Sequence, residues 1–132
     1  MIRGYCECRR VQFEADGEIE DFSHCHCSQC RRLHGAAYAT FAAVDRAKFR
    51  YLAGETGLQV YASSAANDRI FCSTCGSPIL VETKDEPSRL YVSMSTIEGN
   101  PPHPKGHHSW VGSKAPWHEI NDDLEQFEKA AD

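Results

Sequence analysis

Seven cysteines in three short clusters constrain this chain more than any other feature of its sequence. The clusters are Cys6-x-Cys8, Cys25-x-Cys27-x-x-Cys30 and Cys72-x-x-Cys75. An odd number of cysteines cannot all pair within one chain, and a disulfide between neighbouring strand residues would be strained. Cysteines at these short spacings are instead typical of zinc ligands. The sequence therefore predicts a zinc-thiolate protein rather than a disulfide framework.

The spacing also indicates how the cysteines divide between two metal ions. The simplest partition joins the first and third clusters around one closed structural zinc, held by Cys6, Cys8, Cys72 and Cys75. The three cysteines of the middle cluster lie within six residues, so a second ion can collect all of them. Spacing alone does not prove which clusters meet. A zinc with three protein ligands keeps its fourth position for water or substrate, which is typical of catalytic sites.

The middle cluster is therefore the predicted catalytic site, made of Cys25, Cys27 and Cys30. Cys30 is expected in the first turn of a short helix, where the helix dipole favours the thiolate. Arg31 and Arg32 follow at once and could offset the negative charge of the site or bind an anionic substrate.

Two alternatives for the three-cysteine site stay open. Iron could replace zinc, since cysteine clusters also hold iron and iron–sulfur centres. The site could also be purely structural, with a histidine or carboxylate as its fourth ligand. His24, His26 and His34 are near enough in the sequence to fill that position.

Length and charge limit the classes of protein that this chain can represent. Its 132 residues suit one domain, expected to span residues 1–132. The formal net charge of -5 disfavours nucleic acid and anionic membranes as partners. The sequence shows neither a signal-peptide pattern nor a run of about 20 apolar residues. Together with reduced thiols, this predicts a cytoplasmic protein, whose oligomeric state the sequence does not indicate.

Short segments of alternating apolar and polar residues predict a mainly β fold. The expected strands are residues 10–14, 38–44, 58–61, 79–81 and 90–94. A short helix is expected to be capped by Ser28, to run to His34 and to end at Gly35. A second short helix is expected to start at Asn121. Residues 98–108 are rich in proline and glycine and predict a long loop, a kind of segment that is often functional.

The aromatic and basic residues of the C-terminal third have two interpretations. Trp110 and Trp117 could serve packing, which is the usual role of large aromatic side chains. Alternatively, this segment forms a wall over the open metal. In that case His107, Trp110 and Lys114 are the candidate substrate-binding residues.

Four segments of the chain, residues 4–13, 25–32, 71–78 and 108–117, resemble the glutathione-dependent formaldehyde-activating enzyme family, which shares its domain with centromere protein V. All seven cysteines fall on the metal positions of that family. The resemblance implies an Mss4-like β-tent, an arrangement of antiparallel strands with a structural zinc and one or two short helices. It also implies a carbon–sulfur lyase activity that adds a small thiol such as glutathione to an aldehyde, giving S-hydroxymethylglutathione from formaldehyde.

Two other functions compete with this enzyme activity. A non-enzymatic zinc module that binds a protein partner, as Mss4-type relatives do, stays open, although a scaffold needs no open metal position. Methionine sulfoxide reduction occurs on a similar fold but needs a free nucleophilic cysteine. Every cysteine in this chain belongs to a predicted metal cluster, which disfavours that reaction.

Overall fold

The computed structural model describes residues 1–131, which form short strands and little helix. The strands in chain order are β1 (Ile2–Tyr5), β2 (Gln12–Ala15), β3 (Asp21–Cys25), β4 (Ala39–Asp45), β5 (Phe49–Ala53), β6 (Leu58–Ala62), β7 (Asn67–Cys72), β8 (Pro78–Thr83), β9 (Arg89–Ser93), β10 (His107–Ser109) and β11 (Glu125–Gln126). Within this range the one α-helix is α1 (Ser28–His34), and no helix has the length and apolar character that spanning a membrane requires. The predicted mainly β fold is confirmed.

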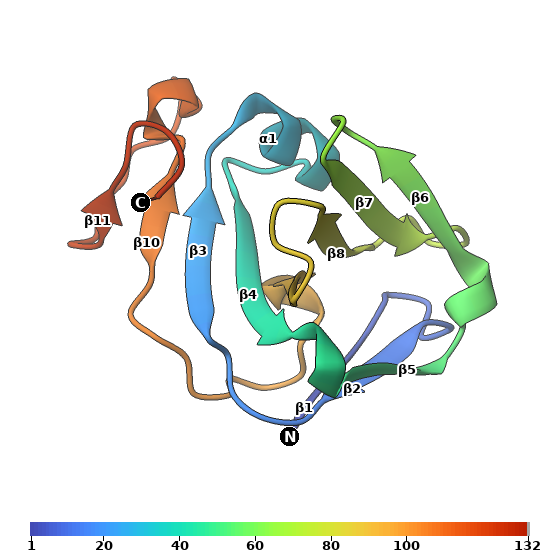
Figure 1. Ribbon diagram of the computed structural model, residues 1–132. Coiled ribbons are helices and arrows are strands. Elements are labelled where there is room, and N and C mark those ends of the chain that lie inside the picture. Colours follow the sequence, from blue (N-terminus) through green and yellow to red (C-terminus); the bar gives the residue numbers. More distant parts are fainter. Residues whose placement is uncertain (132) are drawn as a thin grey trace.

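The strands form two sheets. A three-stranded sheet has the order β1-β2-β5, and an eight-stranded sheet has the order β11-β10-β3-β4-β9-β8-β7-β6. Strands pair antiparallel throughout the described residues except where β10 runs parallel to both β3 and β11. Figure 1 shows α1 lying between the upper ends of β3 and β7, so the helix lies near two strands that are far apart in the sheet order.

Both sheets contribute to one hydrophobic core. Phe13 of β2 packs into the same cluster as Val44, Leu80 and Val92 of the larger sheet, and all four are almost fully buried. Burying a side chain of this size stabilises a fold by about 1.5–3 kcal/mol. The predicted strands at residues 38–44, 58–61, 79–81 and 90–94 correspond to β4, β6, β8 and β9. Alternate residues of β9 are buried, whereas β4 is buried on both faces and β6 is mostly exposed.

The N-cap of helix α1 lies one residue earlier than predicted. The N-cap is Cys27, whose Sγ accepts a hydrogen bond from the backbone N–H of Cys30 at 3.3 Å, and Ser28 is the first helical residue. Gly35 ends the helix with φ of 60°, as expected for a C-cap in the left-handed region. The capping prediction was therefore wrong for Ser28 and correct for Gly35.

The predicted helix at Asn121 is wrong. The segment is extended instead, and β11 pairs in parallel with β10. Phe127 donates its backbone N–H to the His108 carbonyl at 2.9 Å, and the Asp122 carboxylate accepts the N–H of Leu124 at 3.1 Å. These contacts satisfy backbone groups that a short helix with few apolar residues would have left exposed. The predicted loop at 98–108 is confirmed as far as Gly106, and β10 begins at His107.

Gly54 lies where the chain cannot accept a side chain. Its φ is +79°, and a Cβ added there would lie 2.1 Å from the Arg10 carbonyl oxygen. Gly54→Ala should therefore destabilise the fold by about 3 kcal/mol. Gly57→Ala is the matched control, because a Cβ at Gly57 meets no described atom within 4 Å. Denaturant unfolding of both variants at equal metal content measures the difference, and equal midpoints would contradict this account of Gly54.

Candidate functional site

Four cysteines from distant parts of the chain meet in one cluster. Their Sγ atoms all lie within 4.8 Å of one another, in the set Cys6, Cys8, Cys72 and Cys75. The Cys6 and Cys8 sulfurs are 3.5 Å apart, and those of Cys8 and Cys72 are 3.8 Å apart. The cluster therefore ties the turn after β1 to the β7–β8 turn, and it could hold a metal ion. This grouping is the one that the spacing favoured.

Two tight turns aim these sulfurs at one point. In the first, Arg9 has φ of 65° and donates its N–H to the Cys6 carbonyl at 3.0 Å. In the second, Gly76 has φ of 79° and donates its N–H to the Cys72 carbonyl at 2.8 Å. Left-handed backbone is costly for residues other than glycine, so its presence at Arg9 indicates a turn held by its surroundings.

The second cluster is the local one, formed by Cys25, Cys27 and Cys30. Cys25 ends β3, Cys27 caps α1 and Cys30 lies in the first turn of α1. Their sulfurs lie within 4.8 Å of one another, and among residues 1–131 no histidine or carboxylate joins that group. The arrangement offers a metal ion three ligands.

The thiols of this cluster share hydrogen bonds in a way that favours a cation among them. Hydrogen bonds from Cys25 and Cys30 lower the pKa of Cys27 to about 2. Hydrogen bonding with Cys27 raises the pKa of Cys25, and hydrogen bonding with Cys25 raises that of Cys30. One thiolate therefore forms readily and the next two do not, because like charges at this distance repel. A bound cation removes that repulsion.

Arg69 of β7 is a residue of this site that the sequence did not indicate. It is buried, with 9% of its surface exposed. Its Nη1 donates to the Cys30 Sγ at 3.3 Å, and its Nε donates to the Ser63 hydroxyl at 3.1 Å. A buried guanidinium needs a negative partner, and the cysteine cluster supplies one. Arg69 thus offsets charge at the cluster and links α1 to β7.

The three-cysteine cluster opens into a wide cleft of about 890 Å³. All three of its cysteines line the cleft, together with residues of β3, β7, β8, β9 and β10 and of the C-terminal segment. Its charged and aromatic lining residues include Asp21, Arg69, Asp85, Glu86, Tyr91, His107 and Trp110. Pockets of this size hold small-molecule ligands in many proteins.

The structure separates the five residues predicted to bind substrate into two groups. His107 and Trp110 line the cleft, and Trp110 has φ of 57°, a strained conformation for a bulky residue that is often associated with functional sites. Arg31, Arg32 and Lys114 are not among its lining residues. The Lys114 ammonium instead donates to the carbonyl oxygens of Ala115 and His118.

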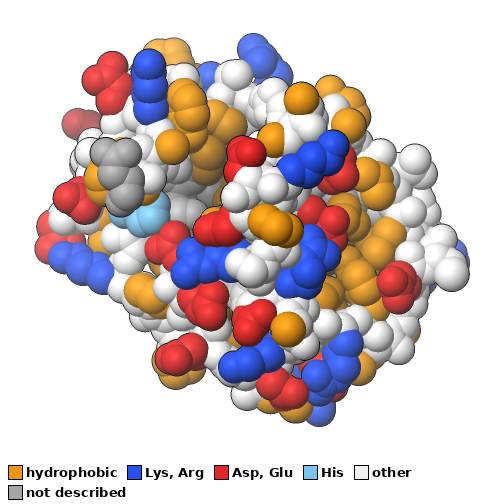
Figure 2. Space-filling view, in the orientation of Figure 1, with side chains coloured by type: hydrophobic (Ala, Val, Ile, Leu, Met, Phe, Trp, Pro, Cys, Tyr) orange, Lys and Arg blue, Asp and Glu red, His pale blue; other side chains and the backbone are white. Residues whose placement is uncertain are grey.

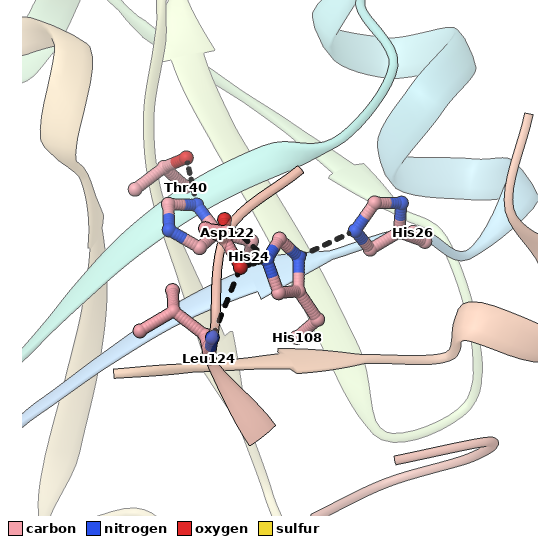
Figure 3. Close-up of polar contacts among 6 residues, drawn as sticks. All are labelled: His24, His26, Thr40, His108, Asp122 and Leu124. Carbon is pink, nitrogen blue, oxygen red and sulfur yellow. Dashed lines mark hydrogen bonds and ion pairs between the residues drawn. The ribbon is translucent and has the colours of Figure 1, made fainter. Parts of the chain in front are cut away.

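A hydrogen-bonded chain joins two buried histidines, His26 and His108, to the exposed Asp122 (Figure 3). His26 Nε2 is 2.8 Å from His108 Nδ1, and His108 Nε2 is 3.0 Å from the Asp122 carboxylate. Both rings are almost fully buried. The backbone N–H of His26 also donates to the Ser109 carbonyl at 2.9 Å. His26, which lies between Cys25 and Cys27 in the sequence, is therefore held by hydrogen bonds to β10, and His108 of β10 is held in turn by Asp122 of the C-terminal segment.

None of the nearby histidines joins the three sulfurs as a converging fourth ligand. Asp122 can only accept, so with neutral rings the protons of His108 and His26 both lie on Nε2. His24 Nδ1 is 2.8 Å from the Thr40 hydroxyl, and the His34 ring packs edge-on against Phe41. None of these rings belongs to the group of converging ligand atoms.

The tautomers follow from this chain and can be checked directly. At pH 7 we expect His26 and His108 to carry their protons on Nε2, because each Nε2–H has an acceptor. Long-range ¹H–¹⁵N correlation spectra of the imidazole nitrogens distinguish the two tautomers. Asp122→Ala should release His108 from this tautomer, whereas Asp123→Ala, next along the chain and paired with Lys105 on the surface, should not. An Nδ1–H signal from His26 in the parent protein would contradict the assignment.

Comparisons with known proteins find several relatives. A family model described as "Glutathione-dependent formaldehyde-activating enzyme" matches residues 1–113. An uncharacterized lyase of Schizosaccharomyces pombe is 29% identical over 96 residues, which are 73% of this chain and 68% of that protein. A Halomonas elongata protein, provisionally named a glutathione-dependent formaldehyde-activating enzyme, is 25% identical over 127 residues, 91% of this chain and 81% of that one. A crystal structure of a Rhodobacter sphaeroides protein matches with a TM-score of 0.63 and 28% identity, covering 76% of this chain and 91% of that chain.

Proposed function

Because the chain belongs to the glutathione-dependent formaldehyde-activating enzyme family, we propose that it is a zinc-dependent carbon–sulfur lyase acting on the adduct of a small thiol and an aldehyde. The observation that carries this proposal is that Cys25, Cys27 and Cys30 all line one cleft. A three-thiolate site that opens to a cleft suits a reaction at the metal, whereas a scaffold would need only the closed site.

The four-cysteine cluster supports zinc as the metal. Two sulfurs bound to one tetrahedral zinc at about 2.3 Å lie about 3.8 Å from each other. The distances of 3.5 Å between Cys6 and Cys8 and 3.8 Å between Cys8 and Cys72 are close to that value. Four converging thiols in a tetrahedral set are characteristic of structural zinc.

The reaction needs a thiol to add to a carbonyl group. The sulfur forms a bond to the aldehyde carbon, the C=O double bond becomes a C–O single bond, and the thiol proton ends on the oxygen. Zinc held by Cys25, Cys27 and Cys30 would lower the pKa of a thiol that enters its fourth position, making the thiol a nucleophile near neutral pH. The lyase direction reverses these steps.

The chain's own residues hold the site in place for this chemistry. Arg69 donates a hydrogen bond to Cys30 and offsets negative charge at the cluster. His26, which separates Cys25 from Cys27 in the sequence, is held by its hydrogen bond to His108. We propose that His107 and Trp110, which line the same cleft, contact the substrate and bring thiol and aldehyde together. Arg31, Arg32 and Lys114 remain predictions from the sequence.

Stepwise loading with zinc tests the proposal. Protein equilibrated so that zinc occupies only the four-thiolate closed site should not accelerate exchange between formaldehyde, glutathione and S-hydroxymethylglutathione above the buffer rate, measured by exchange NMR. The rate should rise in proportion to occupancy as the second zinc is added. Failure of fully loaded protein to accelerate exchange with glutathione, 2-mercaptoethanol or a trimethylammonium thiol would refute the lyase proposal.

A further inference from the structure

The lining of the cleft carries more negative than positive charge. Three carboxylates face it, those of Asp21, Asp85 and Glu86, whereas within residues 1–131 the one lysine or arginine among the lining residues is Arg69. Three thiolates around a divalent metal would add a further negative charge. Figure 2 shows acidic side chains beside the hollow between the C-terminal segment and the β8–β9 turn.

The groups of the cleft that could bind a carboxylate are already engaged. The Arg69 guanidinium donates to Cys30 at 3.3 Å and to Ser63 at 3.1 Å. His107 Nδ1 lies 3.8 Å from the Asp21 carboxylate. A carboxylate on an incoming substrate would therefore meet no unengaged cation among the described lining residues, and binding it would cost desolvation without a compensating partner.

The carboxylates differ in how far they are neutralised. Glu86 accepts a hydrogen bond from the Tyr91 hydroxyl and lies 3.8 Å from an Arg89 nitrogen. Asp85 is exposed on the same turn, and among the described residues it forms no ion pair. Asp85 is thus the lining carboxylate most available to a positive group on a ligand.

We propose that the cleft selects a small thiol carrying a positive charge over thiols carrying carboxylates, glutathione among them. The proposal rests on the lyase function proposed above and specifies its substrate class. Unit charges interacting across a partly hydrated cleft change affinity by a few-fold each, so a cationic thiol should bind about tenfold more tightly than an anionic thiol of equal size at low salt.

The test is equilibrium binding, which does not depend on turnover. Thiols are titrated into protein whose second site holds Co²⁺, and the thiolate-to-cobalt absorption reports binding. The probes are 2-mercaptoethyl-trimethylammonium, 2-mercaptoethanol and 3-mercaptopropionate, compared at a pH chosen to give each the same thiolate fraction. A quaternary amine is used because a primary aminothiol cyclises with formaldehyde in the parallel turnover assay.

We expect affinity to fall from the cationic through the neutral to the anionic thiol. Added salt should weaken binding of the cationic probe and strengthen that of the anionic probe. Asp85→Asn should reduce the cation-to-anion ratio about threefold. Glu18→Gln removes the same charge from an exposed position outside the cleft lining, and should leave the ratio unchanged.

The outcomes separate the two proposals. An anionic probe that binds as tightly as the cationic one, or an unchanged ratio in Asp85→Asn, would overturn the substrate class even if the enzyme turns over glutathione. The expected order of affinities without turnover of any probe would support the charge selection and count against the lyase function.

Discussion

Replacing Cys27 with serine is expected to abolish turnover while leaving the fold intact. The substitution removes one of three thiol ligands of the open site, so metal content should fall by one ion per chain. Loss of metal-ion catalysis typically costs several kcal/mol of transition-state stabilisation, which corresponds to a loss of about a thousandfold or more. Serine is also a good N-cap, so its hydroxyl can accept the Cys30 N–H that Sγ accepts now.

A second variant separates the effect of losing the metal ligand from the effect of losing the helix N-cap. Cys27→Ala loses both the ligand and the N-cap acceptor, so it should be less stable than Cys27→Ser by about 1 kcal/mol. Metal analysis, circular dichroism and the exchange assay together measure these effects. Turnover near the parent rate in Cys27→Ser would show that the open site is not the catalytic site.

Cys72→Ser is expected to have the largest effect on stability. Cys72 is buried in the core, and its sulfur belongs to the cluster that joins the N-terminal turn to β7. Structural zinc contributes about 10–16 kcal/mol of apparent binding energy in small zinc peptides, which is as large as the whole stability of a typical domain. Losing this site should therefore leave most chains unfolded at 25 °C.

Thermal unfolding followed by circular dichroism measures this expectation. Parent protein treated with a strong chelator should resemble Cys72→Ser, and adding zinc back should restore the parent alone. Cys27→Ser is the matched control, since it also loses one cysteine and one metal but keeps the closed cluster. A melting temperature in Cys72→Ser within a few degrees of the parent value would mean that the core holds together without this site.

The sequence predicted the parts of the fold that depend on local pattern. Short apolar or alternating runs located β4, β6, β8 and β9, and apolar residues of β4, β8 and β9 are buried in the shared core. The end of α1 was predicted because Gly35 can adopt positive φ. The parallel pairing of β10 with β3 and β11 was not predicted, and its β3 side joins segments more than 80 residues apart, with His108 opposite His24. The sequence around Asn121 does not distinguish a short helix from an extended segment.

The sequence likewise predicted the residues of the candidate site only in part. Both cysteine groups were predicted, because metal-binding cysteines come in closely spaced sets whose number limits the possible partitions. Arg69 and Asp122 were missed, because their partners, Cys30 and His108, are distant in the sequence. Arg31 and Arg32 were favoured because they follow Cys30 directly, yet the cleft is lined by Arg69. A helix turns successive side chains to different sides, so neighbours in sequence seldom share a site.

The separation of ligands along the chain also sets the order in which the two sites can form. Cys25, Cys27 and Cys30 lie within six residues, so an emerging polypeptide can chelate metal there before any sheet exists. The closed cluster must bring Cys8 to Cys72 across 64 residues, and closing such a loop is slow and entropically unfavourable. During synthesis or refolding, the open site is therefore the first to acquire an ion, and occupancy of the closed site marks a chain whose N-terminal hairpin has docked.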